Sequence, residues 1–109
     1  MEKLKLIKRL LEDKKAEDIV ILDVSELTNI ADFFVIATAN SEIHARSLAE
    51  YLEQELERHG YSLHHIEGLE SGKWILVDAL DIIIHIFTRD WREYYGIEWL
   101  WSEAKRLTV

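Results

Sequence analysis

Two aspartates, Asp78 and Asp81, are the residues whose spacing comes nearest to a catalytic arrangement. A carboxylate pair of this kind can hold the metal ions of a phosphoryl-transfer site. Such a site also needs a glycine-rich loop at the start of a helix, where backbone N–H groups bind the phosphates. The strand-to-helix corner of this chain, residues 38–41, contains no glycine. We therefore expect no enzymatic activity, and a divergent Mg-dependent nucleotidyltransferase is kept as an alternative.

Five histidines among 21 acidic residues raise the question of a metal site. His64 and His65 are adjacent, and neighbouring side chains on a strand point to opposite faces, so the two are not expected to share one ion. His44 and His59 lie too far apart on one predicted helix to act together. The chain has no cysteine, which excludes thiolate ligands and disulfides. We expect neither a metal nor a cofactor.

Length and charge define the class of protein. The 109 residues are enough for one domain, spanning residues 1–109, and the net charge is -8. Nucleic-acid binding needs clustered positive charge, so a basic protein surface is the better partner. No segment reaches the ~18 consecutive apolar residues of a membrane span, and the charged first segment has no secretory signal. We expect a cytoplasmic protein that binds neither membranes nor specific nucleic-acid sequences.

A predicted β-hairpin positions the two aspartates. With Ala79-Leu80 as its turn, Asp78 lies opposite Asp81, and Trp74 lies opposite His85. Alternation then gives one aliphatic face, which must be core, and one mixed face. The aliphatic face contains Ile75, Val77, Ile82, Ile84 and Ile86, and the mixed face contains Trp74, Leu76, Asp78, Asp81, Ile83, His85 and Phe87. Because like charges opposite each other destabilise a hairpin by up to ~1 kcal/mol, either the register differs or a basic group meets that end.

Hydrophobic periodicity predicts the elements around the hairpin. Helical spacing predicts helices over residues 1–15 and 41–59, the second capped by Asn40 or Ser41 and ended by Gly60. Gly68 and Gly72 bracket a polar loop and are expected at positive φ. The remaining predictions are strands over residues 18–24, 32–38 and 61–66, a helical turn or two over 89–95, and a helix over 97–107.

Five aromatic residues gather within a short C-terminal stretch: Trp91, Tyr94, Tyr95, Trp99 and Trp101. Five large rings exceed what one short helix pair usually buries, and exposed aromatic side chains are typical anchors of protein interfaces. A role in the core and a role in an interface are both open for this group.

Four motifs, in unbroken order, resemble the ribosomal silencing factor (Iojap-like) family. They are residues 31–38 with Ser41-x-x-His44, the most distinctive stretch 67–78, the run 81–87 with His85, and Arg92-x-x-Tyr95-x-x-Glu98-x-Leu100-Trp101. The resemblance covers nearly the whole chain. One departure is Leu80, where the family often has glycine. Because a left-handed leucine would cost ~1 kcal/mol or more, we expect a different type of turn.

The resemblance implies a single α/β domain whose mixed β-sheet is flanked by helices, with the shape of a nucleotidyltransferase but without its catalytic residues. It also implies binding to the large ribosomal subunit, through the fourteenth ribosomal protein of the universal large-subunit series. Bound there, family members block joining of the small subunit and lower translation when nutrients are scarce. Organelle relatives act in large-subunit assembly, which is kept as an alternative, and family members are often homodimers.

The expected partner-binding residues lie on the mixed face, in the glycine loop and in the C-terminal motif: Glu67, Ser71, Trp74, Asp78, Asp81, His85, Tyr95, Leu100 and Trp101. We expect Trp74 to be the central apolar anchor. Glu67, Asp78 and Asp81 would accept hydrogen bonds from lysine or arginine side chains of the basic ribosomal protein. For both tryptophans and His85, packing beneath a helix is the alternative.

Overall fold

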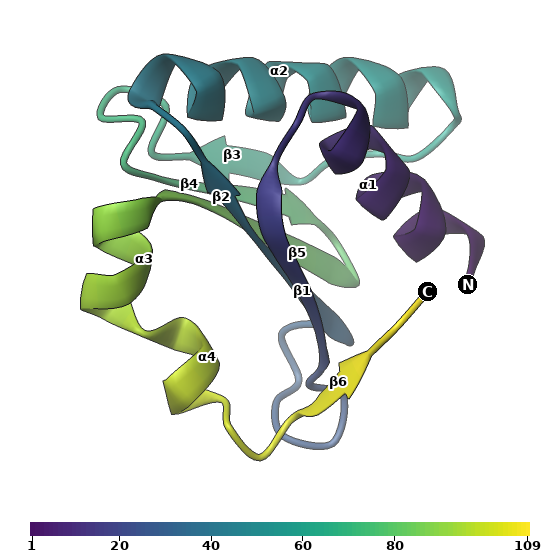
Figure 1. The fold of residues 1–109 in the computed structure, drawn as a ribbon. Helices are drawn as coiled ribbons and strands as arrows, with labels where there is room; N and C mark the ends of the chain where they lie inside the picture. Colours follow the sequence, from purple (N-terminus) through teal and green to yellow (C-terminus); the bar gives the residue numbers. More distant parts are fainter.

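The fold is built on a six-stranded β-sheet with the strand order β3-β4-β5-β2-β1-β6. The computed structural model describes residues 1–109, and Figure 1 shows how the elements are arranged. The strands are β1 (Glu17–Asp23), β2 (Phe33–Ala39), β3 (His65–Glu67), β4 (Trp74–Ala79), β5 (Ile82–Thr88) and β6 (Lys105–Leu107), and the helices are α1 (Glu2–Asp13), α2 (Glu42–Arg58), α3 (Arg89–Tyr95) and α4 (Ile97–Leu100). Strands β2 and β5 are parallel, and the other neighbouring pairs are antiparallel. The expected α/β domain with a mixed sheet is confirmed.

Helices α1 and α2 cover one face of the sheet, and α3 and α4 lie over the other (Figure 1). The predicted apolar stripe of α2 is buried against the sheet and consists of Ala45, Leu48, Ala49, Leu52 and Leu56. At the start of this helix the Ser41 hydroxyl accepts a hydrogen bond from the His44 N–H, as expected for a capping serine. Together with α1 and the aliphatic sheet face, the stripe forms a core of 20 buried residues. None of the helices has the length and apolar character needed to cross a membrane.

The β4–β5 hairpin has the predicted faces but turns one residue later than predicted. Ala79 pairs with Ile82, so the two-residue turn is Leu80-Asp81. The expected opposition of the two aspartates is wrong, because Asp78 pairs with Ile83. Each cross-strand partner moves by two positions, which preserves the alternation of side chains. The aliphatic face is confirmed as core, since Ile75, Val77, Ile82, Ile84 and Ile86 are fully buried.

Leu80 adopts a left-handed backbone conformation, with φ of 72°, so the expectation that this residue avoids that region is wrong. The neighbouring contacts compensate for the strain. The Asp78 carboxylate accepts a hydrogen bond from the Leu80 N–H at 2.9 Å, and Lys3 Nζ donates to the carbonyl of Ala79 and to the carboxylate of Asp81. A basic group therefore does meet this end of the hairpin, and it comes from α1 of the same chain.

The C-terminal segment differs from the helix predicted over residues 97–107. Helix α4 ends at Leu100, and residues 105–107 form β6, which pairs with β1 at the edge of the sheet. Backbone groups of β1 would be unpaired along that edge without β6. Strand β3 is also shorter than predicted, because it begins at His65 and not at Tyr61. Lys8 Nζ donates to the carbonyl of Val109, which holds the C-terminus beside α1 (Figure 1).

Candidate functional site

A continuous group of aromatic rings lies on the sheet face opposite α1 and α2. Trp74 is at its centre, with its ring centroid 5.0 Å from that of Phe87 and 4.6 Å from that of Tyr95. On one side Phe34 contacts the rings of His85 and Trp101, each with a centroid distance of 5.0 Å. On the other side Tyr95 contacts Trp91 and Tyr94. We call these rings the aromatic platform: Phe34, Trp74, His85, Phe87, Trp91, Tyr94, Tyr95 and Trp101.

His85 lies beneath the surface of the platform and orients Trp74. Its side chain is 5% exposed, and its Nδ1 accepts a hydrogen bond from Trp74 Nε1 at 3.2 Å. Burial lowers the pKa of His85 to about 4, so the imidazole is neutral near pH 7. Because Nδ1 is the acceptor, Nε2 carries the hydrogen, and this buried atom has no hydrogen-bond partner. His85 therefore supports the platform from beneath, through its hydrogen bond to Trp74 and its ring contact with Phe34.

Helices α3 and α4 carry large apolar side chains that are exposed. Tyr94 and Trp99 are each 79% exposed, Leu100 is 66% exposed, and Tyr95 is 38% exposed. Helix α3 has no buried residue at all. Trp101 is half-buried and packs edge-on against Phe34. The sequence prediction included Tyr95, Leu100 and Trp101 but omitted Tyr94 and Trp99, and the density of rings over residues 91–101 was the signal that pointed to them.

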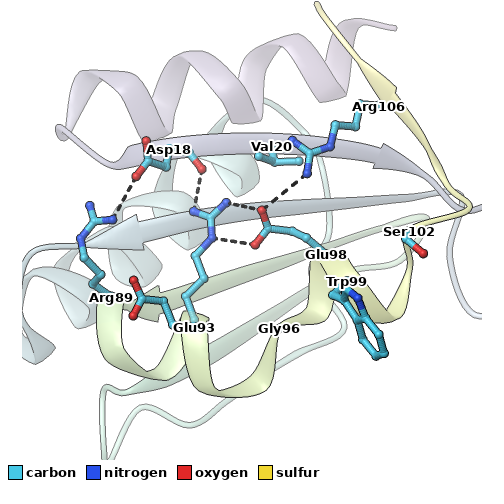
Figure 2. Close-up of a pocket in the computed structure, with 10 residues that line it drawn as sticks. Asp18, Val20, Arg89, Glu93, Gly96, Glu98, Trp99, Ser102 and Arg106 are labelled. Carbon is cyan, nitrogen blue, oxygen red and sulfur yellow. Dashed lines mark hydrogen bonds and ion pairs between the residues drawn. The ribbon is translucent and has the colours of Figure 1, made fainter.

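An ion pair that the sequence prediction also omitted holds α3 and α4 in place (Figure 2). Arg92 Nε and Nη2 donate to the two carboxylate oxygens of Glu98 at 2.9 and 3.0 Å. Arg92 Nη1 donates to the carbonyl of Asp18 and to the hydroxyl of Thr38, which ties α3 to β1 and β2. The Arg92 hydrogen bond is the main cause that lowers the pKa of Glu98. Gly96, with φ of 56°, separates the two helices and lets this pair meet.

The arginines beside this ion pair line a shallow groove of about 620 Å³ (Figure 2). Arg89 donates to the carboxylates of Asp18 and Glu17 at 3.2 Å. Arg106 approaches Glu98 at 3.9 Å. An anion site needs donors that are free to turn toward the ligand, and here the guanidinium groups are already paired with carboxylates. The groove therefore offers little to a phosphate group.

The three expected acidic acceptors do not lie together. Glu67 and Asp78 share the sheet face of Trp74, because they are paired through the β3–β4 ladder with Leu76 and His65 of that same face. Asp78 lies four strand residues from Trp74, about 13 Å along β4. Asp81 is in the turn, where its carboxylate binds Lys3 at 2.6 Å. The structure thus places two of the three acids beside the apolar face and the third in an internal ion pair.

The loop of residues 68–72 is held against α2 and against the start of β4. Gly68 has φ of 88°, and a Cβ atom there would lie 2.1 Å from the carbonyl oxygen of Trp74. Arg46 of α2 donates to the carbonyls of Leu69 and Glu70. The Ser71 hydroxyl accepts a hydrogen bond from the Lys73 N–H at 3.1 Å, so it supports the loop from within. This closely packed loop fixes where β4 begins and hence where Trp74 lies.

Known proteins resemble this chain in both sequence and fold. The chain matches the family described as "Ribosomal silencing factor during starvation" over residues 1–109. It is 38% identical over 103 residues to the ribosomal silencing factor RsfS of Halalkalibacterium halodurans, a match that covers 94% of this chain and 88% of that relative. It is 30% identical over 96 residues to the Mus musculus protein named "Mitochondrial assembly of ribosomal large subunit protein 1", covering 85% of this chain and 42% of that relative.

A solved structure extends the similarity to three dimensions. The crystal structure of a Chromobacterium violaceum protein matches this chain with a TM-score of 0.90 at 40% sequence identity. The match covers 93% of this chain and 84% of that chain. The family match runs through every element that builds the aromatic platform and its supporting ion pair. The chain belongs to the ribosomal silencing factor family.

Proposed function

We propose that this protein is a ribosomal silencing factor that binds the large ribosomal subunit through a basic ribosomal protein, the fourteenth of the universal large-subunit series. Bound there, it blocks joining of the small subunit by its bulk and represses translation under nutrient limitation. The names of the relatives support a regulatory role and not a catalytic one.

The observation that carries this proposal is the exposed apolar surface on α3 and α4. Tyr94, Trp99 and Leu100 are each exposed by about two thirds or more, and Tyr94 contacts Tyr95, whose ring packs on the half-buried Trp74. Clustered large apolar side chains at a surface mark sites of protein binding, because removing their apolar surface from water is favourable. Tryptophan and tyrosine are also the residues that contribute most to binding free energy at protein interfaces.

Acidic side chains around this surface favour a basic partner. Asp90 and Glu93 are exposed on α3, and Glu67 and Asp78 lie on the same sheet face as Trp74. The chain as a whole carries a net charge of -8. Complementary charge accelerates encounter and suppresses wrong partners, so a lysine- and arginine-rich protein suits this surface better than ribosomal RNA.

The decisive experiment is sedimentation of purified ribosomal subunits through a density gradient with and without this protein. We expect the protein to co-sediment with isolated large subunits and to reduce the fraction of joined ribosomes when small subunits are added. Unchanged joining at saturating protein would refute silencing. Co-sedimentation with large-subunit precursors alone would instead favour assembly, the role named for the Mus musculus relative.

A double variant tests whether α3 and α4 form the docking surface. Tyr94→Ala with Trp99→Ala removes two exposed rings, and we expect binding to large subunits to weaken by about a hundredfold, the loss typical of interface anchors. Ile43→Ala is the matched control, because Ile43 is 74% exposed on α2, on the other side of the sheet. Equal binding by the double variant and by the control would show that the partner docks elsewhere.

A charge reversal tests the acidic part of the surface. Asp78→Lys should weaken binding by about tenfold and make the residual binding less sensitive to salt, because an attractive charge becomes a repulsive one. Glu57→Lys makes the same change at an exposed position of α2, and we expect it to bind as the wild type does. If Asp78→Lys retains full affinity, the acids on β3 and β4 lie outside the interface.

A further inference from the structure

We propose that His64, His65 and Asp78 form a binding site for one divalent transition-metal ion, with Zn²⁺ as the best match, at the β3 edge of the sheet. One ligand atom from each of the three side chains lies within 4.8 Å of the others. The sequence argument against this site assumed that both histidines belong to one strand. His64 precedes β3, which begins at His65, so strict alternation does not apply and the two rings lie 4.8 Å apart.

Backbone pairing fixes the positions of all three residues. His65 lies opposite Asp78 in the antiparallel β3–β4 ladder. The His64 N–H donates to the carbonyl of Asp78 at 2.8 Å. The three Cα atoms are therefore held by two strands, and only side-chain rotations are needed to bring the ligand atoms to bonding distance. Such rotations are readily available, because both histidines are exposed.

The contacts around the ligands are those that orient residues in metal sites. His65 Nδ1 faces Asp78 Oδ2 at 3.7 Å, close to the roughly 3.3 Å that separates two ligands of a tetrahedral zinc ion. The other ring nitrogen, His65 Nε2, is hydrogen-bonded to the Glu67 carboxylate. The other oxygen of Asp78 accepts the Leu80 N–H. An imidazole held by a carboxylate on its outer nitrogen is a common arrangement in zinc sites, where it fixes the ring and increases its basicity.

The donor set selects the class of metal. Two imidazole nitrogens and one carboxylate oxygen suit Zn²⁺ and its first-row neighbours, whereas Mg²⁺ and Ca²⁺ prefer oxygen ligands alone. Three protein ligands leave the fourth tetrahedral position for water. The bound ion would join the short edge strand β3 to β4, and it would stabilise the folded chain in proportion to its affinity, since the unfolded chain has no such site.

The test is titration of the intact, metal-free chain with Zn²⁺ by calorimetry, with thermal unfolding as a second readout. We expect one equivalent of Zn²⁺ to bind and the unfolding temperature to rise with the ion concentration. Co²⁺ should bind to the same site and give visible absorption bands of a tetrahedral complex. Absence of saturable binding of either ion in the wild-type chain would overturn the proposal.

Variants assign the ligands and separate them from adventitious binding. His64→Ala, His65→Ala and Asp78→Asn should each lose the stoichiometric site, and Glu67→Gln should weaken it by about tenfold, as for a residue that orients a ligand. His59→Ala is the matched control, an exposed histidine at the end of α2 that should leave binding unchanged. Wild-type affinity in both His64→Ala and His65→Ala, or an equal loss in the control, would contradict the assignment.

Discussion

The two faces of the β-sheet are covered in different ways. Against α1 and α2, 20 buried residues form a core that is entirely aliphatic. Against α3 and α4 the core has 8 buried residues, and the rings of Trp74, Trp91 and Trp101 are only partly covered. Partly buried rings also border the first core, those of Phe33, Tyr51 and Tyr61, but the second core is bordered by three tryptophans and itself contains two phenylalanines. This difference supports the proposal that the fold depends mainly on the first sheet face and that a partner binds at the second.

The largest expected effect comes from the aliphatic face. Leu52→Ala removes a fully buried side chain from the middle of α2, and we expect the free energy of unfolding to fall by about 2–5 kcal/mol. Urea denaturation at constant pH measures this change. Binding to large subunits should stay unchanged at temperatures where the variant is folded. A variant that is stable but defective in binding would show that the two faces are not separate in function.

Acid should lower the stability of the chain through His85, which lies on the sheet face covered by α3 and α4. Its pKa is about 4 in the folded chain and about 6.5 in the unfolded chain. As the pH falls from 6.5 to 4, the unfolded state takes up a proton that the folded state does not, so stability decreases through this window. The loss attributable to His85 should reach about 3 kcal/mol at pH 4 and stay constant below that pH.

Comparison of variants isolates this contribution from that of the acidic residues. His85→Leu lowers stability near pH 7 because the Trp74 N–H loses its acceptor, but it should abolish the extra decrease in stability between pH 6.5 and 4. His59→Ala, a change at an exposed histidine, should keep the decrease. Parallel stability curves for His85→Leu and the wild type would mean that His85 is solvated in the folded chain.

Alanine substitutions at Gly68, in the loop before β4, and at Gly60, after α2, test how closely that loop is packed. Gly68 and Gly60 have similar left-handed backbones, with φ of 88° and 86°. Only at Gly68 would a Cβ meet the chain, 2.1 Å from the carbonyl oxygen of Trp74. Both alanine variants should lose stability because alanine is strained in a left-handed conformation. The free energy of unfolding should fall by about 1–3 kcal/mol more in Gly68→Ala than in Gly60→Ala, because only there does the Cβ overlap the Trp74 carbonyl. Equal loss in both variants would show that the loop can move away from β4.

The aliphatic face was predictable because its signal is local. The spacing of Leu48, Leu52 and Leu56 on one helix, and the alternation of isoleucines in the hairpin, state which side is buried without reference to any other segment. The elements that differ from the sequence prediction depend on contacts between residues far apart in the sequence. Residues 105–107 become a strand because β1 offers an unpaired edge, and the turn is held by Lys3, which is 78 positions from Asp81.

The candidate site was predictable only in part, for the same reason. Alternation correctly placed Asp78 on the face of Trp74, but it assigned no face to Glu67 and could not show that Asp81 has an internal partner on α1. Nor could it show that Arg92 and Glu98 form an ion pair, because their spacing of six positions matches no regular helix. The left-handed Gly96 between α3 and α4 creates that contact.

The smallest expected effect on stability comes from the residues with the largest expected effect on binding. Tyr94 and Trp99 are each 79% exposed, and their side chains add little to the buried core. The double variant Tyr94→Ala with Trp99→Ala should change the free energy of unfolding by no more than about 0.5 kcal/mol, as surface substitutions usually do. Urea denaturation of this variant beside Leu52→Ala gives the comparison directly. A loss above about 2 kcal/mol would show that both rings belong to the folded core, and the assignment of recognition to this face would then lose its main support.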